Sequence, residues 1–315
     1  MSNQVTYKGH DQRFDKWIKA AYPRVAYGVM QKWLRTGQIR VNKKRVKSDY
    51  VLKGGDEVRF PPQFEEVKAP LSKTNKPTGN KKTKSLLQAN IVYDDETCVV
   101  LNKPQGLPVQ GGTNLRDYID LYLGSLLEGQ EEPLRITHRL DKDTSGLLIL
   151  AKTQEAASYY TQAFKKKEIE KTYLAILAGI PQHTRGEIDL AIGKCRGIDR
   201  EKMSSTASAV DPALTHYKVL KVDPEHRLSL IEFQPRTGRT HQLRVHALEG
   251  LKCPILGDGK YGGKEAHPTL PEDMMPLHSD EITLQLCAIS LRFTNPEGKP
   301  ISLTIPLPDH FILTD

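Results

Sequence analysis

Cysteine is scarce in this sequence, and the closely spaced pairs that build disulfide frameworks or zinc sites are missing. The four cysteines are far apart, and none belongs to a Cys-x-x-Cys pair: Cys98, Cys195, Cys253 and Cys287. Structural zinc sites and small disulfide-rich folds both need closely spaced cysteines. We therefore expect neither in this chain, and a reducing compartment suits it.

Long apolar runs are missing as well. The N-terminus, MSNQVTYKGHDQRF, lacks the apolar core of a signal peptide. No apolar run approaches the roughly 18 residues that a membrane helix needs. We expect a cytoplasmic protein, a monomer, with no membrane partner. With 315 residues, 38% of them apolar, the chain can bury the core of one large domain and one small one.

Acidic residues are few in the N-terminal quarter. Residues 1–60 hold 14 Lys and Arg against 5 Asp and Glu, although the net charge of the whole chain is only +8. A small basic module attached to a less basic body is typical of a nucleic-acid tether beside a catalytic domain. Charge alone leaves a solvated lysine-rich surface equally open.

The pattern of this basic segment predicts a small domain over residues 13–62. Apolar spacing on both sides of Pro23 predicts two short helices over 13–36. A strand, a basic turn and a second strand follow over 39–46, and a Gly-Gly-Asp turn precedes a strand over 57–60. This order resembles the S4 domain, an RNA-binding module. The resemblance implies phosphate contacts from these basic residues: Arg13, Lys32, Arg35, Arg40, Lys43, Lys44, Arg45 and Lys47.

The composition changes again after the basic segment. Residues 63–88 are rich in Lys, Pro, Thr and Asn, which predicts a basic flexible linker. Residues 89–315 form the predicted second domain. Its patterns predict a hairpin over 91–104, an amphipathic helix over 114–127, a helix from Thr153 to about Lys167, and strands over 171–179, 213–222 and 228–235. Many strands with few helices and no regular alternation indicate an α+β fold on a mostly antiparallel sheet.

The stretch HRLDKDTSG, residues 138–146, precedes the apolar run 147–151. If it is extended, Arg139 and Asp141 leave the backbone on the same face. An isolated Arg-x-Asp is usually a surface ion pair. This longer stretch resembles the catalytic motif of the RluA family of pseudouridine synthases, and residues 39–62 are similar to the S4 segment of its RluC branch. The resemblance implies that Asp141 is the catalytic residue and that Arg139 replaces the flipped base in the RNA stack.

Three further segments carry the same resemblance. In KTYLAILAG, residues 171–179, it implies that Tyr173 packs against the target uracil. In TGRTHQLRVH, residues 237–246, it implies that Arg244 forms an ion pair with Asp141. The resemblance also implies RNA contacts in the VVLNKP segment and in TGRTHQLRVH. The residues are Asn102, Lys103, Arg239 and His241. Cys287 stands where many relatives have His, a departure at a position without assigned chemistry.

The sequence predicts no metal and no cofactor. His241 and His246 are five positions apart, so they diverge on a helix or a strand and a shared ion is not expected. Residues 257–262 spell Gly-x-Gly-x-x-Gly, but no strand-to-helix unit surrounds them, so a dinucleotide site is not predicted. Pseudouridine formation needs neither redox change nor an external reactant.

We expect a pseudouridine synthase that acts on large-subunit (23S-type) ribosomal RNA. Two alternatives stay open at this point. A nucleoside or glycoside hydrolase would use Asp141 with Asp143, because such enzymes place two carboxylates at a set separation. An RNA-binding protein with an inactive body would keep the basic module without turnover.

Overall fold

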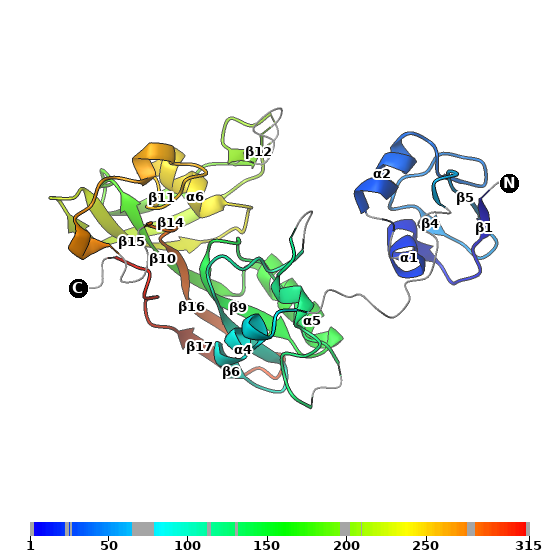
Figure 1. The fold of residues 1–315 in the computed structure, drawn as a ribbon, viewed down its shortest axis with the longest axis horizontal. Helices are drawn as coiled ribbons and strands as arrows, with labels where there is room; N and C mark the ends of the chain where they lie inside the picture. Colours follow the sequence, from blue (N-terminus) through cyan, green and yellow to red (C-terminus); the bar gives the residue numbers. More distant parts are fainter. Residues whose placement is uncertain are drawn as a thin grey trace. The chain divides into compact units, whose positions relative to one another are not determined.

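A computed structural model describes residues 3–22, 25, 27–64, 79–111, 115–129, 132–195, 202–208, 210–275 and 281–312. The chain divides into two compact units, Met1–Thr78 and Gly79–Asp315, which are described separately (Figure 1). Among the described residues, no helix is long and apolar enough to cross a membrane.

The first unit packs two helices on two small sheets. Its helices are α1 (Phe14–Ala21) and α2 (Tyr27–Arg35). One sheet has the order β1 (Gln4–Thr6), β5 (Glu57–Arg59), β3 (Arg40–Val41), and the other pairs β2 (Gln12–Arg13) with β4 (Val51–Leu52). The predicted order of elements is confirmed. The unit also begins before residue 13, because β1 pairs with β5.

A core of its own holds the first unit together. Phe14, Ile18, Met30 and Trp33 from the helices pack with residues of the strands, and all four are at most 7% exposed. Their spacing of three and four residues along each helix gives each helix one apolar face. The basic turn is confirmed as well, since it has a positive φ at Asn42 and at Lys43.

A ten-stranded sheet forms the second unit. Eight strands follow the order β11-β14-β15-β10-β16-β9-β7-β6, while β17 pairs with β16 and β8 with β9. Among the described strands, β9 and β16 make the single parallel pairing. The predicted α+β fold with a mostly antiparallel sheet is therefore confirmed. The bounds are β6 Ile91–Asp94, β7 Cys98–Lys103, β8 Arg135–Ile136, β9 Ser145–Ala151, β10 Glu170–Ala178, β11 Arg185–Asp189, β14 Leu214–Asp223, β15 Leu228–Pro235, β16 Leu286–Thr294 and β17 Pro300–Thr304.

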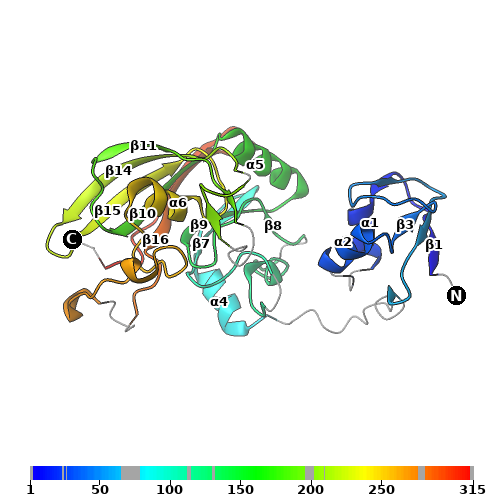
Figure 2. The same cartoon turned by 90° about the horizontal axis from the view of Figure 1, so that it is seen from above.

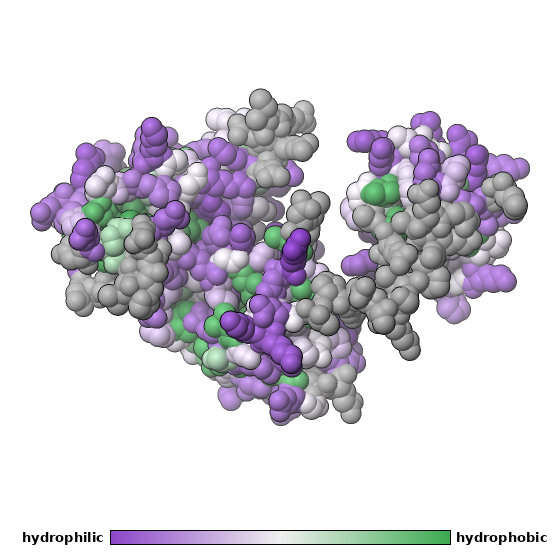
Figure 3. All heavy atoms as spheres, in the orientation of Figure 1, coloured by the Kyte–Doolittle hydropathy of each residue, from purple (hydrophilic) through white to green (hydrophobic). Residues whose placement is uncertain are grey.

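Two helices cover opposite faces of the central strands (Figure 2). Helix α5 (Gln154–Lys166) packs on the face that carries Val100 and Ile149, and α4 (Lys81–Ala89) packs on the face that carries Leu101 and Leu148. Because strand side chains alternate, both faces of β7 and β9 are buried, which explains their unbroken apolar runs. Thr153 caps α5 as predicted by accepting a hydrogen bond from the backbone N–H of Ala156. On the face that Figure 3 shows, hydrophilic side chains alternate with smaller apolar areas.

The predicted linker is shorter than 63–88, because α4 occupies its last part. Asn80 caps this helix by accepting a hydrogen bond from Lys82 N at 2.9 Å, and Leu87 is fully buried. The lysine-rich composition concealed a helix whose lysines face solvent while one leucine anchors it. Residues 65–78 of the predicted linker lie outside the described residues.

The predicted helix over 114–127 is wrong. The described part contains one short 3-10 turn, η1 (Ile119–Leu121). The backbone N–H groups of Ile119 and Asp120 donate to the carbonyls of Pro108 and Val109, which directs them to a neighbouring loop instead of to a helical turn. Ile119 is nevertheless fully buried, as its apolar character suggested.

The remaining short elements surround the far end of the sheet. They are α6 (Gln242–Val245), η3 (His246–Gly250), η4 (Gly263–Ala266), η5 (Glu272–Met274) and the hairpin of β12 (Gly193–Lys194) with β13 (Met203–Ser204). Helix α6 positions site residues, and it contacts η3 and β13.

Candidate active site

Asp141 lies in a tight turn between β8 and β9. The backbone N–H of Thr144 closes the turn by donating to the carbonyl of Asp141 at 3.2 Å. Upstream of the turn, the Thr137 hydroxyl donates to Ile149 O at 2.7 Å, and Ile149 N donates to His138 Nε2 at 3.0 Å. Both residues thus fasten the start of the motif to the buried strand β9, so Asp141 projects from a rigid edge.

His138 belongs to the scaffold of this motif. Its ring packs against Phe164 of α5, with the ring centroids 4.1 Å apart. Burial, with the nearby Lys171 ammonium, lowers the pKa of His138 to about 3. A neutral imidazole is also what the bond from Ile149 N requires, because Nε2 must offer a lone pair.

The structure gives no support to the RNA contact predicted for Lys103. Its side chain is fully buried, and its Nζ donates to the carbonyls of Pro104, Leu107 and Lys142 at 2.8 to 2.9 Å. These three acceptors use all three protons of an ammonium group, although burial lowers the pKa of Lys103 to about 7. The lysine joins the loop after β7 to the turn that carries Asp141. Asn102, its half-buried neighbour, does not line the cavities around Asp141.

Helix α6 forms the opposite wall of the site. Its N-cap is His241, with a positive φ of 53°. The buried amide of Gln242 fixes the preceding loop by accepting hydrogen bonds from Thr237 Oγ1 and Arg239 N and by donating to Leu214 O. This bonding sets the position of His241 beside Asp141.

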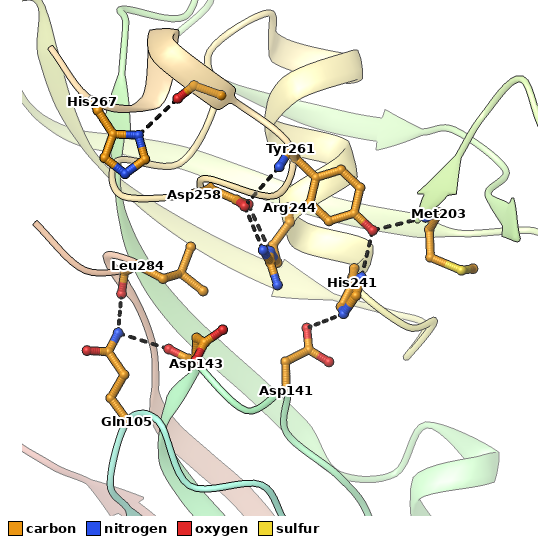
Figure 4. Close-up of polar contacts among 11 residues, drawn as sticks. Gln105, Asp141, Asp143, Met203, His241, Arg244, Asp258, Tyr261, His267 and Leu284 are labelled. Carbon is orange, nitrogen blue, oxygen red and sulfur yellow. Dashed lines mark hydrogen bonds and ion pairs between the residues drawn. The ribbon is translucent and has the colours of Figure 1, made fainter. Parts of the chain in front are cut away.

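Arg244 forms its ion pair with Asp258, not with Asp141 as predicted. Arg244 Nε and NH2 reach the two carboxylate oxygens of Asp258 at 2.8 and 2.6 Å, and both side chains are almost fully buried (Figure 4). The guanidinium also lies over the ring of Tyr261, 5.0 Å from its centroid. A buried guanidinium needs a close carboxylate to offset its desolvation, and Asp258 provides one with bidentate geometry.

Among the described ion pairs, the one that includes Asp141 joins it to His241. Its Nε2 lies 3.9 Å from Asp141 Oδ2, and its Nδ1 lies 2.6 Å from the hydroxyl of Tyr261 (Figure 4). That hydroxyl also accepts a hydrogen bond from Met203 N at 3.0 Å, so its own proton is available for Nδ1. The Nε2 proton then faces the carboxylate. Burial lowers the pKa of His241, and the charge of Asp141 opposes that shift.

Two cavities meet at Asp141. The smaller one, of about 100 Å³, is lined by six predicted site residues: Arg139, Asp141, Tyr173, Arg239, His241 and Arg244. The larger one, of about 940 Å³, also reaches Asp141 and is lined by the loops around Gln105 and Thr283. The structure thus brings together side chains from segments a hundred residues apart. Among the described residues, no group of three His, Cys, Asp or Glu is arranged to hold a metal ion.

Tyr173 lies on β10, between Phe233 of β15 and Ala288 of β16 in the sheet register. Burial and the charge of Asp141 raise the pKa of its phenol, so the hydroxyl stays protonated. Its ring is a flat apolar surface in the same cavity as the carboxylate.

The eight basic residues predicted to bind RNA in the first unit all lie on its surface. Seven are exposed, and Arg40 is half-buried with its guanidinium donating to the carbonyls of Gly37 and Lys43. Arg13 makes a bidentate ion pair with Asp15. The other six exposed cations are available to phosphates.

Sequence reasoning missed two residues of the site, Asp258 and Tyr261. They occupy the Gly-x-Gly-x-x-Gly segment, whose Gly257 has a φ of 76° and no room for a Cβ against the carbonyl of Thr283. The glycines allow a tight turn that presents Asp258 to Arg244. The sequence prediction had paired Arg244 with Asp141, and the acid between two glycines of this turn was the signal that could have identified Asp258.

Comparisons with known proteins give the family of this chain. The RNA pseudouridylate synthase family matches residues 97–249, and the S4 domain family matches residues 12–58. "Ribosomal large subunit pseudouridine synthase C" of Rickettsia conorii is 39% identical over 86% of this chain and 88% of its own length. The protein of that name from Vibrio vulnificus is 31% identical over 94% and 89%.

A solved structure gives the same result for the second unit. "Human RNA Pseudouridylate Synthase Domain Containing 4" is 33% identical, with a TM-score of 0.61 over 73% of this chain and 93% of that chain. Sequence and fold therefore agree that this chain belongs to the RNA pseudouridylate synthase family and carries an S4 domain at its N-terminus.

Proposed function

We propose that the protein isomerises uridines of large-subunit ribosomal RNA to pseudouridine, with Asp141 as the catalytic carboxylate. The observation that carries this proposal is the carboxylate of the smaller cavity: Asp141 lies there with the Tyr173 ring and several cations, and no second acid among the described residues lines it. The relatives named above supply the substrate class, since their names specify the large ribosomal subunit.

The reaction breaks the bond between uracil N1 and ribose C1′ and forms a bond between C5 and C1′. C5 loses a proton and N1 gains one, so no external reactant is consumed. A carboxylate serves this reaction by attacking C1′ or by stabilising the positive charge that develops there. Asp141 is held on a rigid turn for either role, and Tyr173 offers its ring face to the uracil.

The target uridine must leave its stack before Asp141 can reach it, at a cost of a few kcal/mol. Arg139 is exposed at the mouth of both cavities. Its planar guanidinium is suited to fill the vacated place between bases. In this proposal Arg244 does not form an ion pair with Asp141, because its guanidinium is neutralised by Asp258.

Asp141→Asn tests the proposal, with Asp143→Asn as the matched control from the same turn. Wild type and Asp143→Asn should form pseudouridine in large-subunit ribosomal RNA, detected by carbodiimide labelling. Asp141→Asn should fold and bind RNA. Its rate of pseudouridine formation should fall by a factor of at least about 10³, as expected when an essential charged group is removed.

Each alternative function gives a different result. Release of free uracil, with Asp143→Asn as damaging as Asp141→Asn, would indicate a hydrolase. Salt-dependent binding of the RNA without any turnover by the wild type would indicate an RNA-binding protein. Near wild-type pseudouridine formation by Asp141→Asn would exclude the catalytic role of this residue.

A further inference from the structure

Lys171 is a cation of the smaller cavity for which the reaction chemistry has no use. It lies on β10 two residues before Tyr173, at a point where the register of β10 against β16 shifts between Thr172 and Tyr173. Both line the cavity that contains Asp141. Lys171 is half-buried, and burial together with the like charge of Lys167 lowers its pKa to about 8.

Lys171 has no carboxylate partner among the described ion pairs. Its charged neighbours instead disfavour it, because Lys167 lies nearby and His138 is neutral. A partly buried ammonium without a counter-charge is less stable than one that has a partner. A bound anion would supply the counter-charge that the described ion pairs do not give to Lys171.

The charges of the smaller cavity give the sign of the missing partner. Arg244 is neutralised by Asp258, and in the described part of the chain Asp141 is the single acid that lines the cavity. Arg139, Lys171 and Arg239 therefore face one carboxylate, which leaves an excess of positive charge. A flipped nucleotide brings two phosphodiester groups with it, one on each side of its ribose.

We propose that Lys171 binds a backbone phosphate next to the flipped uridine and so holds the ribose over Asp141. This inference rests on the proposed function. Arg239, from the loop after β15, is placed for the other flanking phosphate. Lys171 is a binding residue here, and the reacting atoms remain with Asp141.

The first test compares Lys171→Met with Lys171→Arg and with Lys165→Met, a control on the outer face of α5. Activity is measured on an RNA fragment whose target uridine has been mapped with the wild type. Lys171→Met should raise KM about tenfold, with a smaller change in kcat, and should lower the salt dependence of binding by about one phosphate contact. Lys171→Arg should retain most of the affinity, and Lys165→Met should resemble the wild type.

Stability distinguishes binding from a structural role. Lys171→Met should unfold at the same urea concentration as the wild type or at a higher one, because it removes an unpaired buried charge. A lower midpoint for Lys171→Met, with the loss of activity following the unfolded fraction, would overturn the proposal.

A neutral linkage in the RNA identifies the phosphate directly. RNAs with one methylphosphonate on the 5′ or on the 3′ side of the target uridine remove one charge each. One of these RNAs should bind the wild type about tenfold more weakly than the unmodified RNA does. The same RNA should bind Lys171→Met as tightly as the unmodified RNA does. Equal losses for wild type and Lys171→Met with both RNAs would overturn the proposal. If the wild type makes no pseudouridine in any RNA, the proposed function fails instead, and the two results are distinguishable.

Discussion

At the scale of single residues, the site does not pair Arg244 with Asp141, which were expected from the sequence to form an ion pair. Arg244 carries the buried ion pair with Asp258, while Asp141 faces the imidazole of His241 at 3.9 Å. A carboxylate held directly by a guanidinium would be a weaker nucleophile, because its charge would be shared with two N–H donors. The observed pairing keeps Asp141 available to a substrate.

His138 makes stability depend on pH in a predictable direction. Its pKa is about 3 in the folded protein and about 6.5 in the unfolded chain, so the unfolded chain binds a proton that the folded protein excludes. Stability should therefore fall as the pH decreases through 6.5, and this loss should continue toward pH 3.

His138→Gln should remove this part of the acid sensitivity, because an amide oxygen can accept the hydrogen bond from Ile149 N without titrating. Urea unfolding at pH 7.5 and pH 5.0 measures how much free energy of unfolding each protein loses between the two pH values. The wild type should lose more than His138→Gln, by an amount on the order of 1–2 kcal/mol. His183→Gln, at an exposed position, is the control. Equal pH dependence of wild type and His138→Gln would contradict the assignment.

At the scale of elements, the end of β7 and the turn before β9 are joined by one side chain. Lys103 Nζ bridges the loop at Leu107 and the turn at Lys142. Gln105 adds a second connection, since its amide donates to the carbonyls of Asp143 and Leu284. The position of Asp141 thus depends on elements that are distant in sequence.

Lys103→Met should destabilise the second unit by about 3 kcal/mol, because it leaves buried carbonyls without donors. The loss should appear as a lower urea midpoint and a lower kcat, while the RNA affinity of the folded fraction changes little. Lys142→Met, which removes an exposed lysine from the same turn, should leave the midpoint unchanged. A weaker RNA affinity for Lys103→Met at full stability would restore the original prediction of an RNA contact.

At the scale of the whole molecule, two separate cores predict two units that fold independently. The core of the first unit and those of the second have no residue in common. Residues 79–315 alone should therefore unfold cooperatively with the same midpoint as in the full chain.

The same fragment should bind ribosomal RNA more weakly and with a smaller salt dependence, because it lacks the exposed cations of the S4 domain. Titrations at several salt concentrations measure this difference against the full chain. Unchanged affinity and salt dependence would show that the first unit contributes no phosphate contacts.

The sequence determined much of this protein by local patterns. Helices at 14–21, 27–35 and 154–166, and the strands over 170–178, 214–223 and 228–235 could all be predicted, as could the segments around Arg139, Tyr173 and Arg239 that line the smaller cavity. Apolar periodicity and capping residues act over a few positions, so they can be found without knowledge of the fold. The motif around Asp141 was recognisable for the same reason.

Tertiary structure decided which side chains meet. Lys103 was predicted at the RNA and is buried under three carbonyls, and the guanidinium of Arg244 turned to Asp258 instead of Asp141. From sequence, a long cationic side chain is predicted to be exposed, because the acceptors that surround it are known only from the fold. Which carboxylate pairs with a buried cation depends on both groups being buried together. Both depend on contacts between distant segments, which the packing of β7, β9, β10 and α6 around one cavity creates.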